Sequence, residues 1–217
     1  MVRLLYSLIF LFLTLSCDNT FFSDSSKNTY DDDISDITFL NYYFFTTNND
    51  LSTNVGSQID LFKYYVDNVT NNTVIDDKYD LLMNGQGYLA IDNDGTDLYL
   101  QSKTTHLLFK YSATADMADI TMDTITANWQ PCGISYQIEI DSLIAIYRNL
   151  DTLNQFRART FSKDLSFQSG RDIRFDLNFI DTTYNGIYAL ENKGTFFYML
   201  GIDTTQNNIL IMTNNSF

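Results

Sequence analysis

"GYLAIDNDGTDLYL", residues Gly87 to Leu100, has a second copy 99 residues later in the chain, "GIYALENKGTFFYM", Gly186 to Met199. In both copies two apolar runs flank a short polar centre. Six positions hold the same residue in the two copies: Gly87/Gly186, Ala90/Ala189, Asn93/Asn192, Gly95/Gly194, Thr96/Thr195 and Tyr99/Tyr198. This self-similarity predicts that one structural unit is repeated along the chain.

The polar centre of the first copy resembles a calcium loop, because Asp92, Asp94 and Asp97 offer three carboxylates around Gly95. In the second copy Lys and Phe replace two of these aspartates. An EF-hand also needs Gly at its sixth position and Glu at its twelfth, which this spacing does not provide. Both copies keep a Gly between two apolar runs, which is typical of a tight hairpin turn at positive φ. We therefore predict a β-hairpin here and no metal site.

Further strands follow the hairpins at matching distances. A related hairpin, "CGISYQIEIDSLIAIYR", lies between the two copies. Third strands are expected at 105–113, 154–162 and 207–215, and fourth strands at 119–126 and 172–179. Four short strands repeated about every 50 residues resemble the blades of a β-propeller.

This resemblance implies one all-β domain over 36–217, with propeller-like repeats near 87–131, 132–185 and 186–217 and an irregular one at 36–86. The same hairpins also suit a β-sandwich, a soluble barrel or an outer-membrane β-barrel. "DITFLNYYF", Asp36 to Phe44, begins like the fourth strands "DITM" and "DIRF". Because one terminus of a propeller commonly completes the blade begun by the other, we predict that 36–44 pairs with 207–213.

The N-terminus has the pattern of a secretory signal peptide over residues 1–16. Arg3 precedes an apolar core from Leu4 to Leu15, which is shorter than the ~20 residues that a membrane-spanning helix needs. The ending "LTLSC" resembles a bacterial lipobox, although Thr14 stands where Leu, Val or Ile is usual. The resemblance implies lipidation of Cys17, a flexible tether over 17–35, and anchoring in the bacterial cell envelope, either periplasmic or surface-exposed. Secretion without an anchor is the alternative.

The net charge and the sequence motifs limit the classes of function that the chain is expected to have. The net charge of −14 argues against nucleic acid as a partner. His106 is the single histidine and no phosphate-binding glycine motif is present, so we expect neither a cofactor nor a histidine-rich metal site. A glycoside hydrolase using an Asp/Glu pair is the enzymatic alternative, although Glu occurs only at Glu139 and Glu191. Cys132 precedes an apolar strand and is expected to be a buried thiol.

All the arginines beyond the signal peptide lie between positions 148 and 174. On neighbouring strands they would form a basic patch, and Arg suits carboxylate or phosphate groups. Pairing with Asp164, Asp172 and Asp176 is the alternative. Trp129, the single tryptophan, offers a stacking surface for a sugar or packs in the core. The candidate ligand-binding residues are Trp129, Arg157, Arg159, Arg171 and Arg174, and the expected function is non-catalytic binding of a protein or glycan partner, or a scaffold role.

Overall fold

The computed structural model describes residues 34–48, 61–79, 88–102, 105–114, 116–181, 187–193 and 196–214. The fifteen strands in these ranges all belong to one unit of the chain, Asp33–Phe217. The signal-peptide range, Cys17 and the tether as far as residue 33 lie outside the described residues, and the first strand begins at Ile34. Within the described ranges, no helix is long and apolar enough to cross a membrane.

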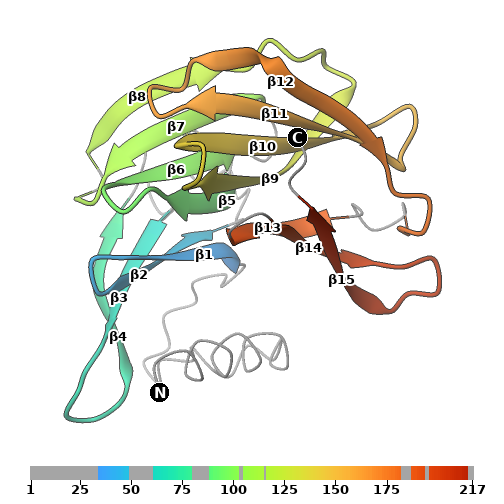
Figure 1. Ribbon diagram of the computed structural model, residues 1–217. Coiled ribbons are helices and arrows are strands. Elements are labelled where there is room, and N and C mark those ends of the chain that lie inside the picture. The colour runs from blue at the N-terminus through green and yellow to red at the C-terminus, as the bar shows by residue number, and fades with distance from the viewer. Residues whose placement is uncertain are drawn as a thin grey trace, which may run out of the picture. The chain divides into compact units, whose positions relative to one another are not determined.

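The strands form four antiparallel sheets that follow one another along the chain (Figure 1). The first sheet contains β1 (Ile34–Leu40), β2 (Tyr43–Asn48), β3 (Leu61–Val66) and β4 (Thr73–Tyr79). The second contains β5 (Tyr88–Asn93), β6 (Asp97–Ser102), β7 (Leu107–Ser112) and β8 (Met117–Met122). The third contains β9 (Trp129–Gln137), β10 (Ser142–Asn149), β11 (Gln155–Ser162) and β12 (Phe167–Asp176). The fourth contains β13 (Ile187–Lys193), β14 (Phe196–Ile202) and β15 (Asn208–Asn214).

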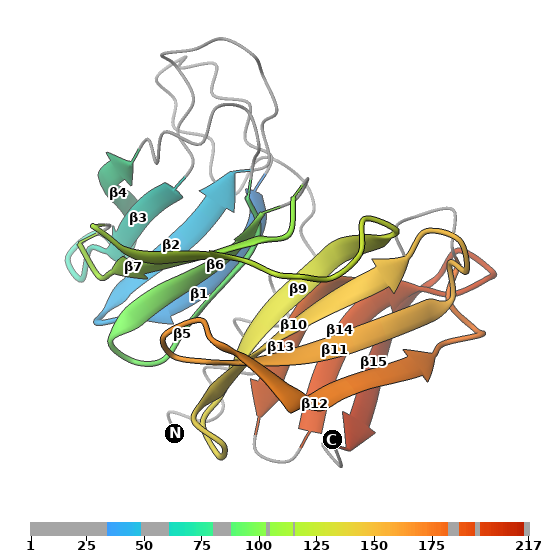
Figure 2. The ribbon, with the colours of Figure 1, turned by 90° about the horizontal axis from the view of Figure 1, so that it is seen from above.

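The first strands of the four sheets contact one another in series. β1 contacts β5, β5 contacts β9, and β9 contacts β13 (Figure 2). Each sheet is a meander in which every strand pairs with its neighbour in sequence. Consecutive four-stranded meanders whose first strands lie together have the architecture of β-propeller blades.

A separate hydrophobic cluster fills each junction between consecutive sheets. Leu98 and Leu100 of β6 pack toward the first sheet, whereas Tyr99 between them packs toward the third. In β10, Leu143 and Ala145 likewise face the second sheet. Ile144 and Ile146, which alternate with them, pack with the fourth sheet. Because side chains alternate between the two faces of a strand, a sheet buried on both faces requires a continuous apolar run, and "SLIAIYR" is such a run.

The range 36–86 contains a four-stranded sheet, and the prediction that 36–44 pairs with 207–213 is wrong. β1 pairs with β2, while β15 pairs with β14. The chain reverses after Leu40 because Asn41 and Tyr42 have φ angles of 51° and 70°. Positive φ at both central residues defines the type I′ turn of two-residue hairpins, and Asn tolerates it well. Residues 36–44 are therefore a hairpin and not a single strand.

The predicted hairpin of the first repeat copy is confirmed. β5 pairs with β6, and Gly95 has a φ of 90° at the first central position of the turn. The Asp94 N–H donates to the Asp97 carbonyl over 3.2 Å, which closes the turn. Gly194, the corresponding residue of the second copy, lies outside the described residues.

Candidate functional site

Charged side chains gather at the junction of the second and third sheets. Arg157 and Arg159 are two residues apart on β11 and therefore share one face of the sheet. The register places Arg174 of β12 opposite Arg157, and Asp172 opposite Arg159. These four residues, together with Arg171 and Trp129, are called the arginine cluster below. It contains every ligand-binding residue that the sequence suggested.

Trp129 lies at the start of β9 and is only 4% exposed. The guanidinium groups of Arg157 and Arg174 each lie 5.7 Å from the centre of its ring. Cations over an indole face are attracted by its quadrupole. The ring is therefore placed as a support for the two arginines, and its buried position leaves little surface for stacking a sugar.

Two aspartates neutralise part of the arginine cluster. Asp172 accepts hydrogen bonds from Arg157 Nε at 2.6 Å and from Arg157 Nη2, and Arg159 lies 3.4 Å from it. Burial alone would raise the pKa of Asp172, but the bonds from Arg157 outweigh it and the pKa is lowered. Arg159 also forms an ion pair at 2.7 Å with Asp123, which the sequence analysis had not considered. Burial raises the pKa of Asp123 despite the Arg159 charge.

Of the three aspartates that the sequence offered as arginine partners, Asp172 is thus a partner and Asp164 bonds to Ser162 and Ser166 instead. Asp176 is exposed and forms no ion pair with the residues that the structure describes. Arg171 and Arg174 are exposed on β12. Neither forms an ion pair within the part of the chain that the structure describes. The arginine cluster consequently presents two cations to solvent on a chain with a net charge of −14.

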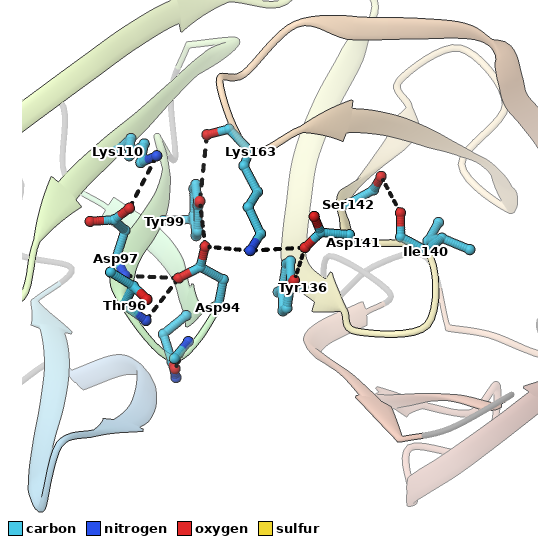
Figure 3. A network of polar contacts seen from close by, with 12 residues as sticks. Asp94, Thr96, Asp97, Tyr99, Lys110, Tyr136, Ile140, Asp141, Ser142 and Lys163 are labelled. Carbon is cyan, nitrogen blue, oxygen red and sulfur yellow. Dashed lines mark hydrogen bonds and ion pairs between the residues drawn. The ribbon is translucent and has the colours of Figure 1, made fainter.

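Lys163, in the turn between β11 and β12, connects the hairpins of two sheets (Figure 3). Its Nζ lies 3.3 Å from Asp94 in the β5–β6 turn and 2.8 Å from Asp141 in the β9–β10 turn. Tyr99 donates its hydroxyl to Asp94 at 3.1 Å, and Tyr136 donates to Asp141. The hydrogen bond that Lys163 donates to Asp141 raises the pKa of Lys163. This arrangement holds the second and third sheets together at one end of their junction.

The three carboxylates of the calcium-like stretch serve different partners. Asp94 accepts the backbone N–H groups of Thr96 and Asp97 at 2.9 and 2.8 Å, besides Lys163. Asp97 pairs with Lys110 at 3.1 Å. Asp92 points toward β9 instead. The resemblance to a calcium loop therefore arises from turn-capping and ion-pairing aspartates that happen to be close in sequence.

Two carboxylates on the first strands have pKa values well above the usual range. Asp36 of β1 accepts the backbone N–H of Ile91 in β5 at 3.0 Å. Asp92 of β5 accepts the backbone N–H of Tyr136 in β9 at 2.6 Å. Burial, only partly offset by these N–H bonds, raises the pKa of Asp36 to about 7 and that of Asp92 to about 6. Each carboxylate thus links one sheet to the backbone of the next.

A groove of about 330 Å³ lies where β8 faces the turn between β11 and β12. We call it the edge groove, because β8 is the last strand of the second sheet. Its lining consists of Asp119, Ile120, Thr121, Met122, Asp123 and Thr124 on one side and Phe161, Asp164, Leu165, Ser166 and Phe167 on the other. Asp123 and its partner Arg159 connect the groove with the arginine cluster.

Two further residues have structural positions. His106 is half-buried before β7, and its Nε2 lies 2.6 Å from the Trp129 carbonyl oxygen. Cys132 is a buried free thiol as expected, and burial raises its pKa to about 12. A thiol with that pKa is protonated at neutral pH and is a poor nucleophile.

Sequence reasoning missed Asp123, Lys163 and the linking role of Asp36 and Asp92. No shared sequence pattern marks the last two: "DIT" occurs at Asp36 and again at Asp119, whereas Asp92 begins "DND". Asp123 pairs with Arg159 of the next repeat, and Lys163 pairs with Asp94 of the preceding repeat and with Asp141, 22 positions away, so no local pattern identifies these pairs.

No protein-family model matches the chain, and no curated protein matches its sequence. Among solved structures, the periplasmic gluconolactonase of Pseudomonas aeruginosa aligns with a TM-score of 0.52 and 12% identity, over 83% of this chain and 56% of that one. The hydrazine synthase of Kuenenia stuttgartiensis aligns with a TM-score of 0.51 and 12% identity, over 89% of this chain and 49% of that one. This chain therefore spans about half of each neighbour. At such identity the likeness concerns the fold alone, and it confirms the all-β, propeller-like prediction.

Proposed function

We propose that this protein is lipid-anchored in the bacterial cell envelope and binds a protein or glycan partner without catalysis. The observation that carries the binding role is the exposed edge of the arginine cluster. Arg174 presents a cation beside Trp129, and Arg171 is exposed three residues earlier on β12, on an otherwise acidic chain. Guanidinium groups recognise carboxylate and phosphate groups by paired hydrogen bonds. The partner is therefore expected to present anionic groups to this surface.

The binding test compares the unmodified protein with an Arg171→Ala/Arg174→Ala variant. The probes are polygalacturonate as an acidic glycan, polyglutamate as an acidic peptide, and neutral dextran. We expect an acidic probe to bind and the double variant to lose at least about tenfold in affinity. A Lys63→Ala/Lys110→Ala variant removes the same charge elsewhere and should bind as the unmodified protein does. Equal binding by all three proteins, or by dextran, would contradict the proposed site.

The anchor is proposed from the N-terminal resemblance to a lipobox. Intact mass of the protein from its native membrane should equal that of a chain beginning at an acylated Cys17. A Cys17→Ala variant should be recovered in the soluble fraction. An unmodified chain cleaved at another position would exclude the anchor and favour a freely secreted protein.

A glycoside hydrolase remains the second candidate because two carboxyl groups with raised pKa, those of Asp36 and Asp92, lie on neighbouring first strands. Carboxyl groups with pKa values near neutrality suit general acid catalysis. Both already bond to backbone N–H groups, which favours a structural role. Release of reducing sugar from polygalacturonate or dextran, abolished by Asp92→Asn in a folded variant, would establish the enzyme instead.

A further inference from the structure

The tripeptide Asp-Ile-Thr occurs in two edge strands. Asp36, Ile37 and Thr38 lie in β1, and the same three residues begin at Asp119 in β8. β1 is the first strand of the first sheet and β8 the last strand of the second. Each pairs with only one neighbour among the described strands. β1 lies against β5 of the second sheet, so the similarity marks two edge strands and not a common position within the repeat.

In both strands the aspartate is held in the same way. Asp36 Oδ1 accepts the N–H of the next residue, Ile37, at 2.8 Å, and Asp119 Oδ1 accepts that of Ile120 at 2.8 Å. Asp92 does the same toward Asn93 at 2.7 Å. One oxygen is thereby fixed on the strand's own backbone. The second oxygen is left to point away from the strand that carries it.

At Asp36 and Asp92 the second oxygen binds a strand that lies alongside. Asp36 Oδ2 accepts the backbone N–H of Ile91, and Asp92 Oδ2 accepts that of Tyr136. Two residues after Asp36, Thr38 accepts a hydrogen bond at 2.7 Å from the Asn93 side chain of the same neighbouring strand. The molecule therefore shows twice what an aspartate held in this way binds: the backbone N–H of an extended strand.

At Asp119 the corresponding place is open. Asp119 is exposed, and its Oδ2 has no hydrogen-bond partner within the described ranges of the chain. Both Asp119 and Thr121, the counterparts of Asp36 and Thr38, line the edge groove. Six consecutive residues of the β8 region form one side of this groove, so it follows the strand direction.

The edge groove also has an exposed apolar side chain and a fixed wall. Phe167, which pairs with Phe161 on the face toward the second sheet, is 37% exposed. The opposing turn is held by hydrogen bonds of 3.0 Å from Ser162 N–H to the Ser166 carbonyl and 2.9 Å from Leu165 N–H to the Ser162 carbonyl. The Arg159 guanidinium lies 3.8 Å from the centre of the Phe167 ring, and this contact helps to hold Phe167 in place. A preformed wall lowers the ordering cost of binding.

We propose that the edge groove binds an extended segment of a partner protein, whose backbone N–H donates to Asp119 as Ile91 N–H does to Asp36. Apolar side chains of the segment lie against Phe167. Basic side chains meet Asp119 and Asp164, the two exposed carboxylates of the lining. Addition of a strand to a sheet edge is a common mode of peptide recognition. The inference rests on the proposed binding role, but it identifies the partner as a protein and uses a surface other than Arg171 and Arg174.

The test uses a fluorescently labelled peptide of alternating valine and lysine and measures anisotropy with the full chain. A second peptide carries a methyl group on the backbone nitrogen of every valine, and a third carries one on that of every lysine. Each methylated peptide therefore lacks the backbone N–H donors along one edge of the extended peptide. We expect the parent peptide to bind and one of the two methylated peptides to bind at least about tenfold more weakly. Asp119→Asn, which removes the acceptor oxygen, should weaken the parent peptide similarly. Asp176→Asn removes the same charge from an exposed position on β12 and should leave binding unchanged.

Three outcomes would overturn the proposal: no binding of the parent peptide at millimolar concentration, equal binding of all three peptides, or equal binding to the Asp119→Asn and Asp176→Asn variants. The methylated peptides keep the test valid if a variant does not fold. A dimer that Asp119→Asn dissociates, with no peptide binding, would assign the groove to a second copy of this chain and also refute a separate partner. If the Arg171→Ala/Arg174→Ala variant fails its test while the peptide binds as expected, only the anionic-ligand site is refuted and the proposal for the edge groove stands.

Discussion

Aspartates at two places in the molecule bind different partners: Asp36 and Asp92 join neighbouring sheets, whereas Asp172 binds within the third sheet. Asp36 and Asp92, on the first strands, bind backbone N–H groups, and their pKa values rise to about 7 and about 6. Asp172, in the arginine cluster, binds two guanidinium groups, and its pKa falls. Backbone dipoles offset the loss of hydration only in part, whereas a full positive charge outweighs it. The same side chain therefore favours its neutral form near the first strands and its ionised form in the arginine cluster.

The largest effect is expected from removing the charge that neutralises Asp123. Arg159 and Asp123 have side chains that are 4% and 0% exposed, so Arg159→Leu leaves a buried carboxylate without its cation. We expect the free energy of unfolding, measured in urea at pH 7, to fall by about 3–5 kcal/mol. A matched Arg159→Leu/Asp123→Asn variant should recover part of this loss. A loss below about 1 kcal/mol in the single variant would contradict the importance of this ion pair.

An intermediate effect is expected from pH. A carboxyl group whose pKa is higher in the folded chain takes up a proton on folding. The contribution of Asp36 and Asp92 is therefore complete below their usual pKa of 3.8 and is lost as the pH rises through about 6 and about 7. We expect the free energy of unfolding to be clearly lower at pH 8 than at pH 4, because both carboxyl groups hold their proton more tightly in the folded chain.

The control for this prediction is the same pH series on an Asp36→Asn/Asp92→Asn variant, which should show a much flatter dependence. Asp172 contributes in the opposite sense, because its lowered pKa provides stability above pH 3.8 that is lost on further acidification. The stability contributed by Asp36 and Asp92 is therefore lost in a different pH range from the stability contributed by Asp172. An unchanged slope in the variant would show that other groups cause the dependence.

The smallest effect is expected at Lys163. Its side chain is 39% exposed, so water screens its ion pairs with Asp94 and Asp141. We expect Lys163→Met to cost less than about 1 kcal/mol at low salt, with the difference vanishing in 1 M NaCl. Lys110→Met, which removes the pair with Asp97 in the same hairpin region, is the matched control. If Lys163→Met lowered the free energy of unfolding as much as Arg159→Leu does, burial would not explain a difference in strength between the two kinds of ion pair.

Local patterns predicted much of the fold but not the pairing of β1. Apolar runs and the turn at Gly95 identified the repeated hairpins, because alternation and positive φ are properties of a few adjacent residues. "DITFLNYYF" was misread as one strand since Asn41 and Tyr42 turn the chain without a glycine. Its likeness to "DITM" was real, but it reflects how an aspartate in an edge strand binds the N–H of the next residue and not which strand completes which sheet.

For the candidate site, the sequence by itself determined which residues were available: the arginines grouped between 148 and 174, the single tryptophan, and a chain of hairpin repeats. Only the tertiary structure decided that Arg159 meets Asp123, that Lys163 joins two hairpins, and that Asp36 and Asp92 each bind the backbone of the next sheet. These contacts join residues from different strands and mostly different sheets, many of them more than 30 positions apart. Periodicity and turn chemistry act over a few residues, so they specify the strands, whereas packing between sheets selects the partners.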